Sequence, residues 1–538
     1  MGRQRFLGLR GASLTAVIVF VAGCEFLLFG YDQGVFGGII NLNSFTSTFP
    51  SMCTTAACVK GMTSHQKSHR STIQGVSVAC YNIGCLMGAL STFRLGNVLG
   101  RRKSIFIGCC IVSVGAILQA SSFTMTQLII GRIICGVGTG INTATMPVWQ
   151  AECTKPHQRG PIMAFETSLV PLGVMTSYWV DFGFSYAEPS QIAWRFPVAL
   201  QLVFALVVLC LILSLPESPR WLLLQDRWEE ATEVLSALYD APAGDVVVAE
   251  ELASIRATIE TQRNVTWKDV FHEGPLKTRS RTILAVSIQI MSQFTGINVI
   301  TYYATSIFQN EIGLSPFMSR ILSGALGTDS FISGMISVWV IKTFDRRNVM
   351  MFNLSGMTVS MVVLAVTRKF TGYKAGIVAT VFLFVFKAFF ALGFAQIPWI
   401  YPAEITPLAT RVQANAISTA TNWVCVFTIV MIAPIAFNNI GWKTYLIFAS
   451  CNVAALFVVF FFYPETRNRS LEEIDLVFHN STSPLKVVMV AKRTEHHFGK
   501  KGEVITSLTK DMTAAEDGMV KDLGHVAHVE SIAKCMRG

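Results

Sequence analysis

The chain has 538 residues, of which 52% are hydrophobic and only 14% are charged, and its formal net charge is +10. A soluble protein of this length carries charge on roughly a quarter of its residues, so the composition excludes a soluble globular protein. Because many apolar residues lie in runs of about 20, long enough to cross a bilayer, we expect an integral membrane protein. Its basic residues then face anionic lipid, and no nucleic-acid partner is needed to explain the charge.

The apolar runs predict an all-α fold of about twelve transmembrane helices in two groups of six. The N-terminal run continues past the length of a signal peptide, without a small-residue cleavage site, so we interpret it as the first helix. The spans are expected near residues 14–40, 71–93, 104–121, 126–148, 161–182 and 193–215, and near 282–309, 318–341, 349–367, 374–402, 412–437 and 441–463.

Two polar stretches divide the chain further. Residues 216–280 join the two halves (14–215 and 281–463) and contain short amphipathic helices. Residues 464–538 form a charged tail with little periodicity after Phe478, which we expect to be largely disordered. Lys and Arg are more frequent in loops on one side of the alternating helices, which places the N-terminal segment 1–13 and the tail in the cytoplasm.

The two halves repeat short motifs in the same order, about 250 residues apart, as transporters built from parallel repeats do. LGRRKS (99–104) corresponds to FDRRNV (344–349), and PESPRW (216–221) corresponds to PETRNR (464–469). We interpret these motifs as a cytoplasmic charge cluster in each half that holds one conformation and releases it; topology anchoring by basic residues is the alternative. The clusters comprise Arg101, Arg102, Glu152, Arg159 and Glu217, and Arg346, Arg347, Glu404, Arg411 and Glu465.

Six motifs together carry a resemblance to a known family. They are GYDQGV (30–35), GRIICGVGTG (131–140), PESPRW (216–221), QFTGINVITYY (293–303), IPWIYPAEITP (397–407) and YPETRNRSLEEID (463–475). They resemble the sugar porter family of the major facilitator superfamily, and within it the fungal hexose and polyol transporters, over about residues 14–478. The resemblance implies alternating access around a sugar bound between pseudo-symmetric halves. We expect a monomer in the plasma membrane.

Asp32 lies in FLLFGYDQGVFGG, an apolar, glycine-rich part of the first predicted helix. A carboxyl group buried alone favours its neutral form, because ionisation in a low dielectric is costly. Arg132, in the apolar GRIICGVGTG helix, is the natural counter-ion. The resemblance implies that Asp32 and Arg132 form a proton-coupling pair, with the proton as coupling ion and no other cofactor. The alternative is that Asp32 only braces the glycine-rich bend.

Sugar hydroxyls bind amide groups and sugar C–H faces pack on aromatic rings. The resemblance and the residue types indicate a substrate site formed by Gln289, Gln293, Asn298, Tyr302, Trp399 and Asn422, with Thr167 where hexose transporters of the family carry glutamine. Ser292 also replaces a second glutamine of the family motif. Three intramembrane charges are candidates for a substrate contact or an internal pair: Glu166, Asp329 and Lys387. Together these departures point away from an orthodox glucose site and toward a polyol, a disaccharide, a sugar acid or another polyhydroxylated compound.

The sequence therefore predicts a proton-coupled importer of a hexose, polyol or related polyhydroxy compound. A passive facilitator, an exporter of a sugar-like metabolite and a non-transporting nutrient sensor are the alternatives, and the short tail without repeats argues against the sensor. The pattern shows no nucleophile–base pair and no metal cluster, so we expect neither an enzyme nor a metal site. In the first exterior loop, Cys53 and Cys58 can pair as a disulfide.

Overall fold

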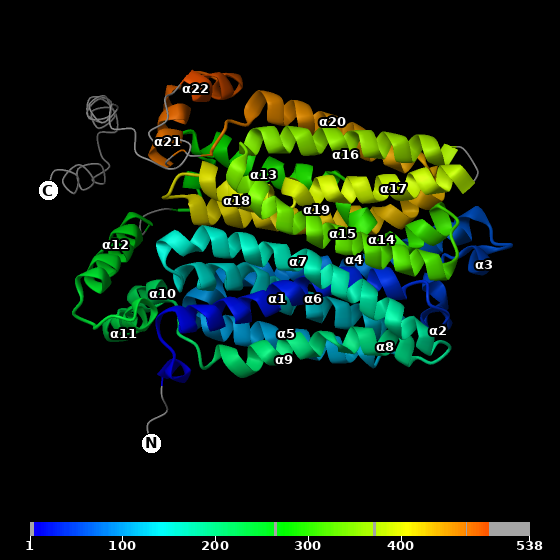
Figure 1. The fold of residues 1–538 in the computed structure, drawn as a ribbon, viewed down its shortest axis with the longest axis horizontal. Coiled ribbons are helices and arrows are strands. Elements are labelled where there is room, and N and C mark those ends of the chain that lie inside the picture. The colour runs from blue at the N-terminus through cyan, green and yellow to red at the C-terminus, as the bar shows by residue number, and fades with distance from the viewer. Residues whose placement is uncertain (1–4, 263–265, 370–372, 468, 470, 494–538) are drawn as a thin grey trace.

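The computed structural model describes residues 5–493 except 263–265, 370–372, 468 and 470, and among them it contains only helices and connecting loops (Figure 1). The N-terminal half consists of α1 (Gly11–Ile39), α4 (Ser64–Leu99), α5 (Arg101–Ala120), α6 (Met125–Glu152), α7 (Pro156–Phe184), α8 (Ile192–Ala199) and α9 (Gln201–Ile212). The C-terminal half consists of α13 (Thr278–Phe294), α14 (Ile297–Ser306), α15 (Pro316–Thr343), α16 (Arg346–Lys369), α17 (Tyr373–Phe389), α18 (Ile397–Ile405), α19 (Arg411–Ile440) and α20 (Lys443–Phe462).

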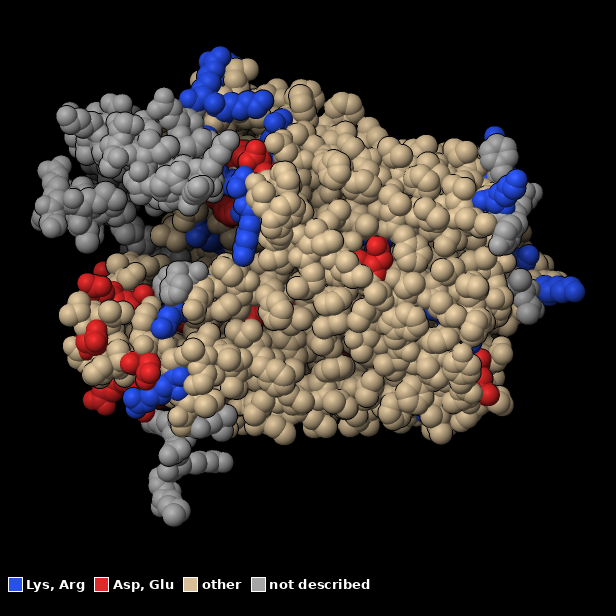
Figure 2. All heavy atoms as spheres, viewed as in Figure 1, with Lys and Arg blue, Asp and Glu red and all other residues tan. Residues whose placement is uncertain are grey.

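Eleven segments of the described chain are long and apolar enough to cross a membrane. The helix α7, with 29 residues, packs between α1 and α15 and supplies the twelfth span. The fold class predicted from the apolar runs is thus confirmed. Figure 2 shows a charge distribution that suits a bilayer: on the visible face, charged side chains gather at the two ends of the molecule, and the long middle section is nearly free of them.

Three spans are each built from two helices: α8 with α9, α13 with α14, and α17 with α18. Gly296, at a φ of +95°, separates α13 from α14, a backbone conformation that glycine adopts without strain. The π-helix η6 (Phe390–Phe394) and the two residues after it separate α17 from α18. Pro398 is the second residue of α18. Such breaks occur in transporters where the freed backbone lines a cavity between the halves.

The smaller elements define the two ends of the bundle (Figure 1). The linker helices α10 (Pro219–Leu224), α11 (Trp228–Tyr239) and α12 (Val246–Gln262) lie at one end, here called the linker end, where η1 (Arg5–Gly8) precedes α1. The helices α2 (Asn43–Thr48) and α3 (Ala56–Val59), with the short η2 (Pro50–Met52), lie at the other, the loop end.

The expected disorder of the tail is wrong for its first part. The helix α21 (Leu471–Asn480) is followed by η7 (Pro484–Lys486) and α22 (Val487–Arg493), so order extends beyond Phe478. Val487 and Ala491 are buried against the C-terminal half and provide the apolar contacts that stabilise α22. Residues 494–538 lie outside the described part of the chain.

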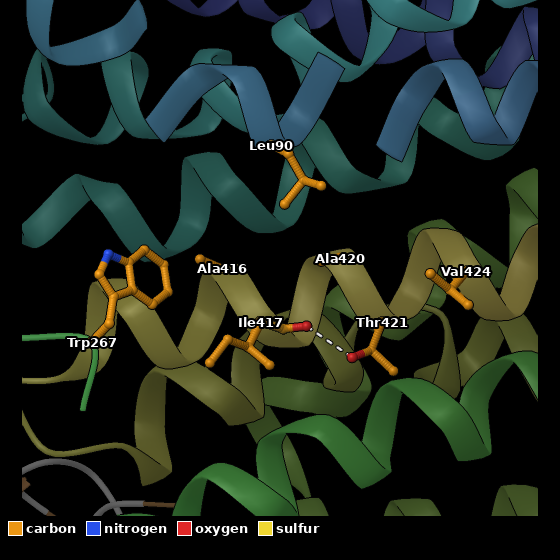
Figure 3. A pocket seen from close by; sticks show the side chains of 7 residues that line it. All are labelled: Leu90, Trp267, Ala416, Ile417, Ala420, Thr421 and Val424. Carbon is orange, nitrogen blue, oxygen red and sulfur yellow. Dashed lines mark hydrogen bonds between the residues drawn. The ribbon is translucent and has the colours of Figure 1, made fainter. Parts of the chain in front are cut away.

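The two halves touch at the loop end and diverge toward the linker end. Near the loop end, a Cβ placed on Gly75 of α4 would lie 2.3 Å from the carbonyl oxygen of Met431 on α19, so the two backbones are in contact. Toward the linker end, the same two helices enclose an apolar hollow of about 440 Å³ (Figure 3). It is lined by Leu90, Trp267, Ala416, Ile417, Ala420, Thr421 and Val424.

Candidate functional site

Asp32 lies inside the N-terminal half, on α1, and is only 1% exposed. Its Oδ2 accepts a hydrogen bond from the Tyr81 hydroxyl at 3.2 Å, and the Thr139 hydroxyl lies at 3.5 Å. The Cys135 thiol is a more distant donor at 3.9 Å. The Oδ1 atom of Asp32 has no hydrogen-bond partner among the described residues. The carboxyl group is therefore surrounded by neutral donors.

Arg132 of α6 is buried in the same core but forms no ion pair with Asp32. Its guanidinium carbon lies 3.9 Å from the ring centre of Phe36 and 5.0 Å from that of Tyr81. Its Nη2 donates to the Val78 carbonyl at 2.7 Å. The predicted direct contact is thus absent in this conformation, because the guanidinium stacks on an aromatic ring of α1 while Tyr81 contacts both charged side chains.

Tyr81 was missed from the sequence, although a signal existed. It stands in CYNIG, where a hydroxyl and an amide interrupt the second apolar run. The neighbouring Asn82 is fully buried and accepts a hydrogen bond from the Tyr302 hydroxyl of α14 at 3.4 Å. This pair connects the core of the N-terminal half directly to the predicted substrate-binding motif of the C-terminal half.

Three of the predicted substrate-binding amides form one buried hydrogen-bonded chain. Asn298 donates to Gln293 Oε1, and Gln293 Nε2 donates to Asn422 Oδ1, which joins α14, α13 and α19. Gln289, one turn before Gln293, donates instead to the Pro398 carbonyl of α18 at 2.9 Å. Chained amides can exchange these partners for substrate hydroxyls without leaving a buried group unsatisfied.

The other two predicted substrate residues are placed differently. The Thr167 hydroxyl donates within its own helix, to the carbonyls of Met163 and Ala164. Trp399 of α18 is 43% exposed. Neither is hydrogen-bonded to the amide chain among the described residues.

The three additional charges make no hydrogen bond to this chain among the described residues. Glu166 of α7 is fully buried, and neither carboxyl oxygen has a hydrogen-bond partner among the described residues. Lys387 of α17 is also buried and donates to the Thr301 hydroxyl of α14 at 3.1 Å. Asp329 of α15 is half-buried and is the acid with which Lys387 interacts electrostatically.

The repeated charged motifs form matching clusters at the linker end. In the N-terminal half, Glu152 lies 3.2 Å from Arg101, and Glu217 accepts from the backbone N–H groups of Arg101 and Arg102. In the C-terminal half, Glu404 lies 3.2 Å from Arg346, and Glu465 accepts from the backbone N–H groups of Arg346 and Arg347.

In each half, an arginine lies seven residues after the cluster glutamate, and its side chain donates to a nearby backbone carbonyl. Arg159 and Arg411 donate to the carbonyls of Thr154 and Thr406, five residues earlier in each case. Arg159 also lies 3.7 Å from Glu251 of the linker helix α12. Every cluster contact described here lies within one half or reaches the linker.

The loop end contains features of two kinds. Cys53 and Cys58 are joined by a disulfide. An ion pair that sequence reasoning missed connects the halves: Arg320 Nη2 of α15 lies 3.3 Å from Glu188 Oε2, in the loop after α7. Glu188 also accepts from the backbone N–H groups of Asn43 and Ser44, at the start of α2. Glu188 looks like an ordinary loop charge and Arg320 lies near the start of a predicted helix, so nothing in the local sequence indicates that they pair.

Two six-helix halves that meet around a buried row of polar side chains define a polytopic membrane carrier. The profile of the family described as "Sugar (and other) transporter" matches residues 16–478. The chain therefore belongs to the sugar porter family of the major facilitator superfamily, in its fungal branch, and is a transporter rather than an enzyme.

Individual relatives agree with this assignment. "Sugar transporter STL1" of Saccharomyces cerevisiae is 37% identical over 497 residues, covering 90% of this chain and 86% of its own. "MFS-type transporter oryC" of Aspergillus oryzae is 33% identical over 542 residues, covering 98% and 97%. The xylose transporter XylE of E. coli, in a partially occluded inward open conformation, shares the fold with a TM-score of 0.72 and 23% identity, covering 85% of this chain and 100% of XylE.

Proposed function

We propose that this transporter imports a sugar or polyol together with a proton by alternating access. It does so across the plasma membrane, as a monomer, with the linker end and both termini in the cytoplasm. The observation that carries the proposal is the environment of Asp32. A deeply buried carboxyl group without an ion pair is stable only when neutral, since a buried unpaired charge costs several kcal/mol.

The arrangement of Arg132 supports the same reading. Its guanidinium stacks on Phe36 and lies near Tyr81, which donates to Asp32. When Asp32 loses its proton, the new carboxylate attracts the guanidinium away from the ring of Phe36. Because Phe36 belongs to α1, which packs on α14, this exchange changes a contact next to the substrate-binding helix.

The substrate assignment rests on the amide chain of Gln293, Asn298 and Asn422, which matches the neutral donors and acceptors that a polyhydroxylated compound requires. STL1 is named a sugar transporter, and XylE is described as a proton:xylose symporter. One proton crossing about 100 mV gains roughly 2.3 kcal/mol. One pH unit adds about 1.4 kcal/mol, so that symport with one proton supports roughly 500-fold accumulation.

The test is uptake of a panel of labelled sugars and polyols in transporter-deficient yeast at pH 5 and pH 7.5. We expect uptake to be higher at pH 5, because external protons load Asp32, and to stop when a protonophore is added. Asp32→Asn should abolish accumulation but retain exchange of labelled for unlabelled substrate, since exchange needs no net proton movement.

The matched control is Glu25→Gln, which neutralises another buried acid on α1, two turns before Asp32. It should keep acid-stimulated accumulation. Accumulation that is independent of pH and retained in Asp32→Asn would make the protein a facilitator instead. Binding without exchange across the whole panel would make it a sensor.

A further inference from the structure

Lys387 is a buried cation that the proton-coupling scheme does not use. It lies on α17 within the membrane-spanning region and is 4% exposed. Its Nζ makes one hydrogen bond among the described residues, to the Thr301 hydroxyl, and forms no ion pair there. Burial of an ammonium group costs several kcal/mol unless its surroundings compensate. Thr301 therefore accepts a charge-assisted hydrogen bond from Lys387.

Thr301 occupies a central position between the halves. Its hydroxyl accepts from Lys387 of α17, and its carbonyl accepts from the Tyr178 hydroxyl of α7. A Cβ placed on Gly37 of α1 would lie only 3.0 Å from the same carbonyl. One residue of α14 thus contacts α17 in its own half and both α1 and α7 in the other.

The helix that carries Thr301 also carries two predicted substrate residues. Asn298 and Thr301 are three residues apart on α14, which places them on one face, and Tyr302 follows directly. This helix has only ten residues, begins after Gly296 and departs from helical geometry at Tyr303 (φ −128°, ψ 23°). So short a segment does not hold its own orientation, and its tertiary contacts decide where Asn298 and Tyr302 point.

We propose that Lys387 is a positioning residue of the substrate site: through the Thr301 hydroxyl it sets the orientation of α14, and Asp329 balances its charge. Asp329 Oδ2 has no hydrogen-bond partner among the described residues and is therefore free to act as the balancing acid. The inference rests on the proposed function, because the consequence of moving α14 is a change in substrate affinity. Direct contact between Lys387 and an anionic substrate is the outcome that would overturn it.

Kinetic measurements provide the first test, with the best-transported compound of the panel. Thr301→Val keeps the side-chain shape without the hydroxyl, and Thr301→Ser keeps the hydroxyl. We expect Lys387→Met and Thr301→Val each to raise KM several-fold with a smaller change in Vmax, while Thr301→Ser stays close to wild type. The double variant should be no worse than the more affected single variant, because both remove the same contact.

Lys374→Met is the matched control, since Lys374 lies on the same helix but is exposed. Its KM should equal that of the wild type. If Lys387→Met loses uptake of acidic sugars alone and Thr301→Val behaves like wild type, Lys387 binds substrate directly and the proposal is wrong. Equal KM values for all variants would also reject it.

A second readout does not depend on knowing the substrate. Asn41 Nδ2 and Ser306 Oγ lie 3.1 Å apart, on the two sides of the contact between α1 and α14. We would introduce cysteine at both positions and a protease site between α11 and α12, so that only a new disulfide keeps the halves together after cleavage. Lys387→Met and Thr301→Val should slow cross-linking several-fold, whereas Thr301→Ser and Lys374→Met should not.

The two measurements distinguish failure of the proposed function from failure of the positioning role of Lys387. If the wild type transports nothing in the panel, the proposed function fails, and the cross-linking rate still decides whether Lys387 positions α14. If transport is normal but the cross-linking rate is the same in all variants, the positioning role fails and the proposed function stands.

Discussion

At the scale of single residues, the strictest requirement is for glycine where two helices touch through their backbones. A Cβ on Gly30 of α1 would lie 2.0 Å from the Val170 carbonyl oxygen of α7. The neighbouring atom belongs to a backbone, which cannot move aside as a flexible side chain can. Two residues before Asp32, this contact fixes the distance between α1 and α7.

We therefore predict that Gly30→Ala separates α1 from α7 and lowers both the amount of folded protein and its melting temperature. The measurement is fluorescence-detected gel filtration after heating in detergent. Gly183→Ala is the matched control, because a Cβ on Gly183 of α7 meets no atom within 4 Å. Equal melting temperatures for the two variants would contradict the backbone-contact argument.

The residue scale also shows how far sequence reasoning reached into the site. Residue types, motifs and the family resemblance predicted a site with Asp32, Arg132 and the amides Gln293, Asn298 and Asn422, and the structure joins these amides in one hydrogen-bonded chain. Sequence reasoning missed Tyr81, because an aromatic residue in an apolar run is usually a packing residue. Only the fold shows that its hydroxyl points at Asp32.

At the scale of elements, the repeated sequence motifs become repeated helix caps. The helices α5 and α16 each begin with two arginines, and a distant carboxylate, Glu217 or Glu465, accepts from their first backbone N–H groups. A carboxylate at a helix N-terminus satisfies otherwise unpaired donors and interacts favourably with the helix dipole. Each cap also ties the first turn of its helix to the segment that leaves the half.

Glu217→Ala and Glu465→Ala should each lower the free energy of unfolding by about 1 kcal/mol, and by similar amounts, because each carboxylate accepts from the first two backbone N–H groups of its helix. Thermal unfolding of the purified protein measures this. Glu250→Ala, an exposed position on the linker helix α12, is expected to leave the melting temperature unchanged. A marked difference between the two cap variants would show that the halves do not use the repeat equally.

At the scale of the whole molecule, the two halves are in contact at the loop end and separate toward the linker end. The pair Arg320–Glu188 connects the halves at the closed end, with side-chain exposures of 14% and 18%. In the proposed alternating-access cycle, opening the loop end must break this pair. It therefore contributes to the balance between the two access states.

Arg320→Gln is predicted to shift the balance toward the state open at the loop end by on the order of 1 kcal/mol, or about fivefold. Cysteine introduced at Asn41 should then react faster with a membrane-impermeant maleimide. Cys53 and Cys58 do not interfere, because they are already joined. Arg368→Gln breaks a pair with Glu311 inside the C-terminal half and is the matched control; faster labelling there as well would mean that the effect is not specific to the contact between halves.

The sequence by itself determined the class of fold and the family, and it supplied the candidate residue types of the site. Crossing a bilayer requires about 20 apolar residues per span. These residues are consecutive in the chain, so the sequence alone reveals them. What only the tertiary structure decided is which polar groups meet: Tyr81 with Asp32, Arg132 with Phe36, and Lys387 with Thr301. These partners lie far apart in the chain, and their contacts depend on helix rotations and crossing points that the packing of backbones at glycines sets.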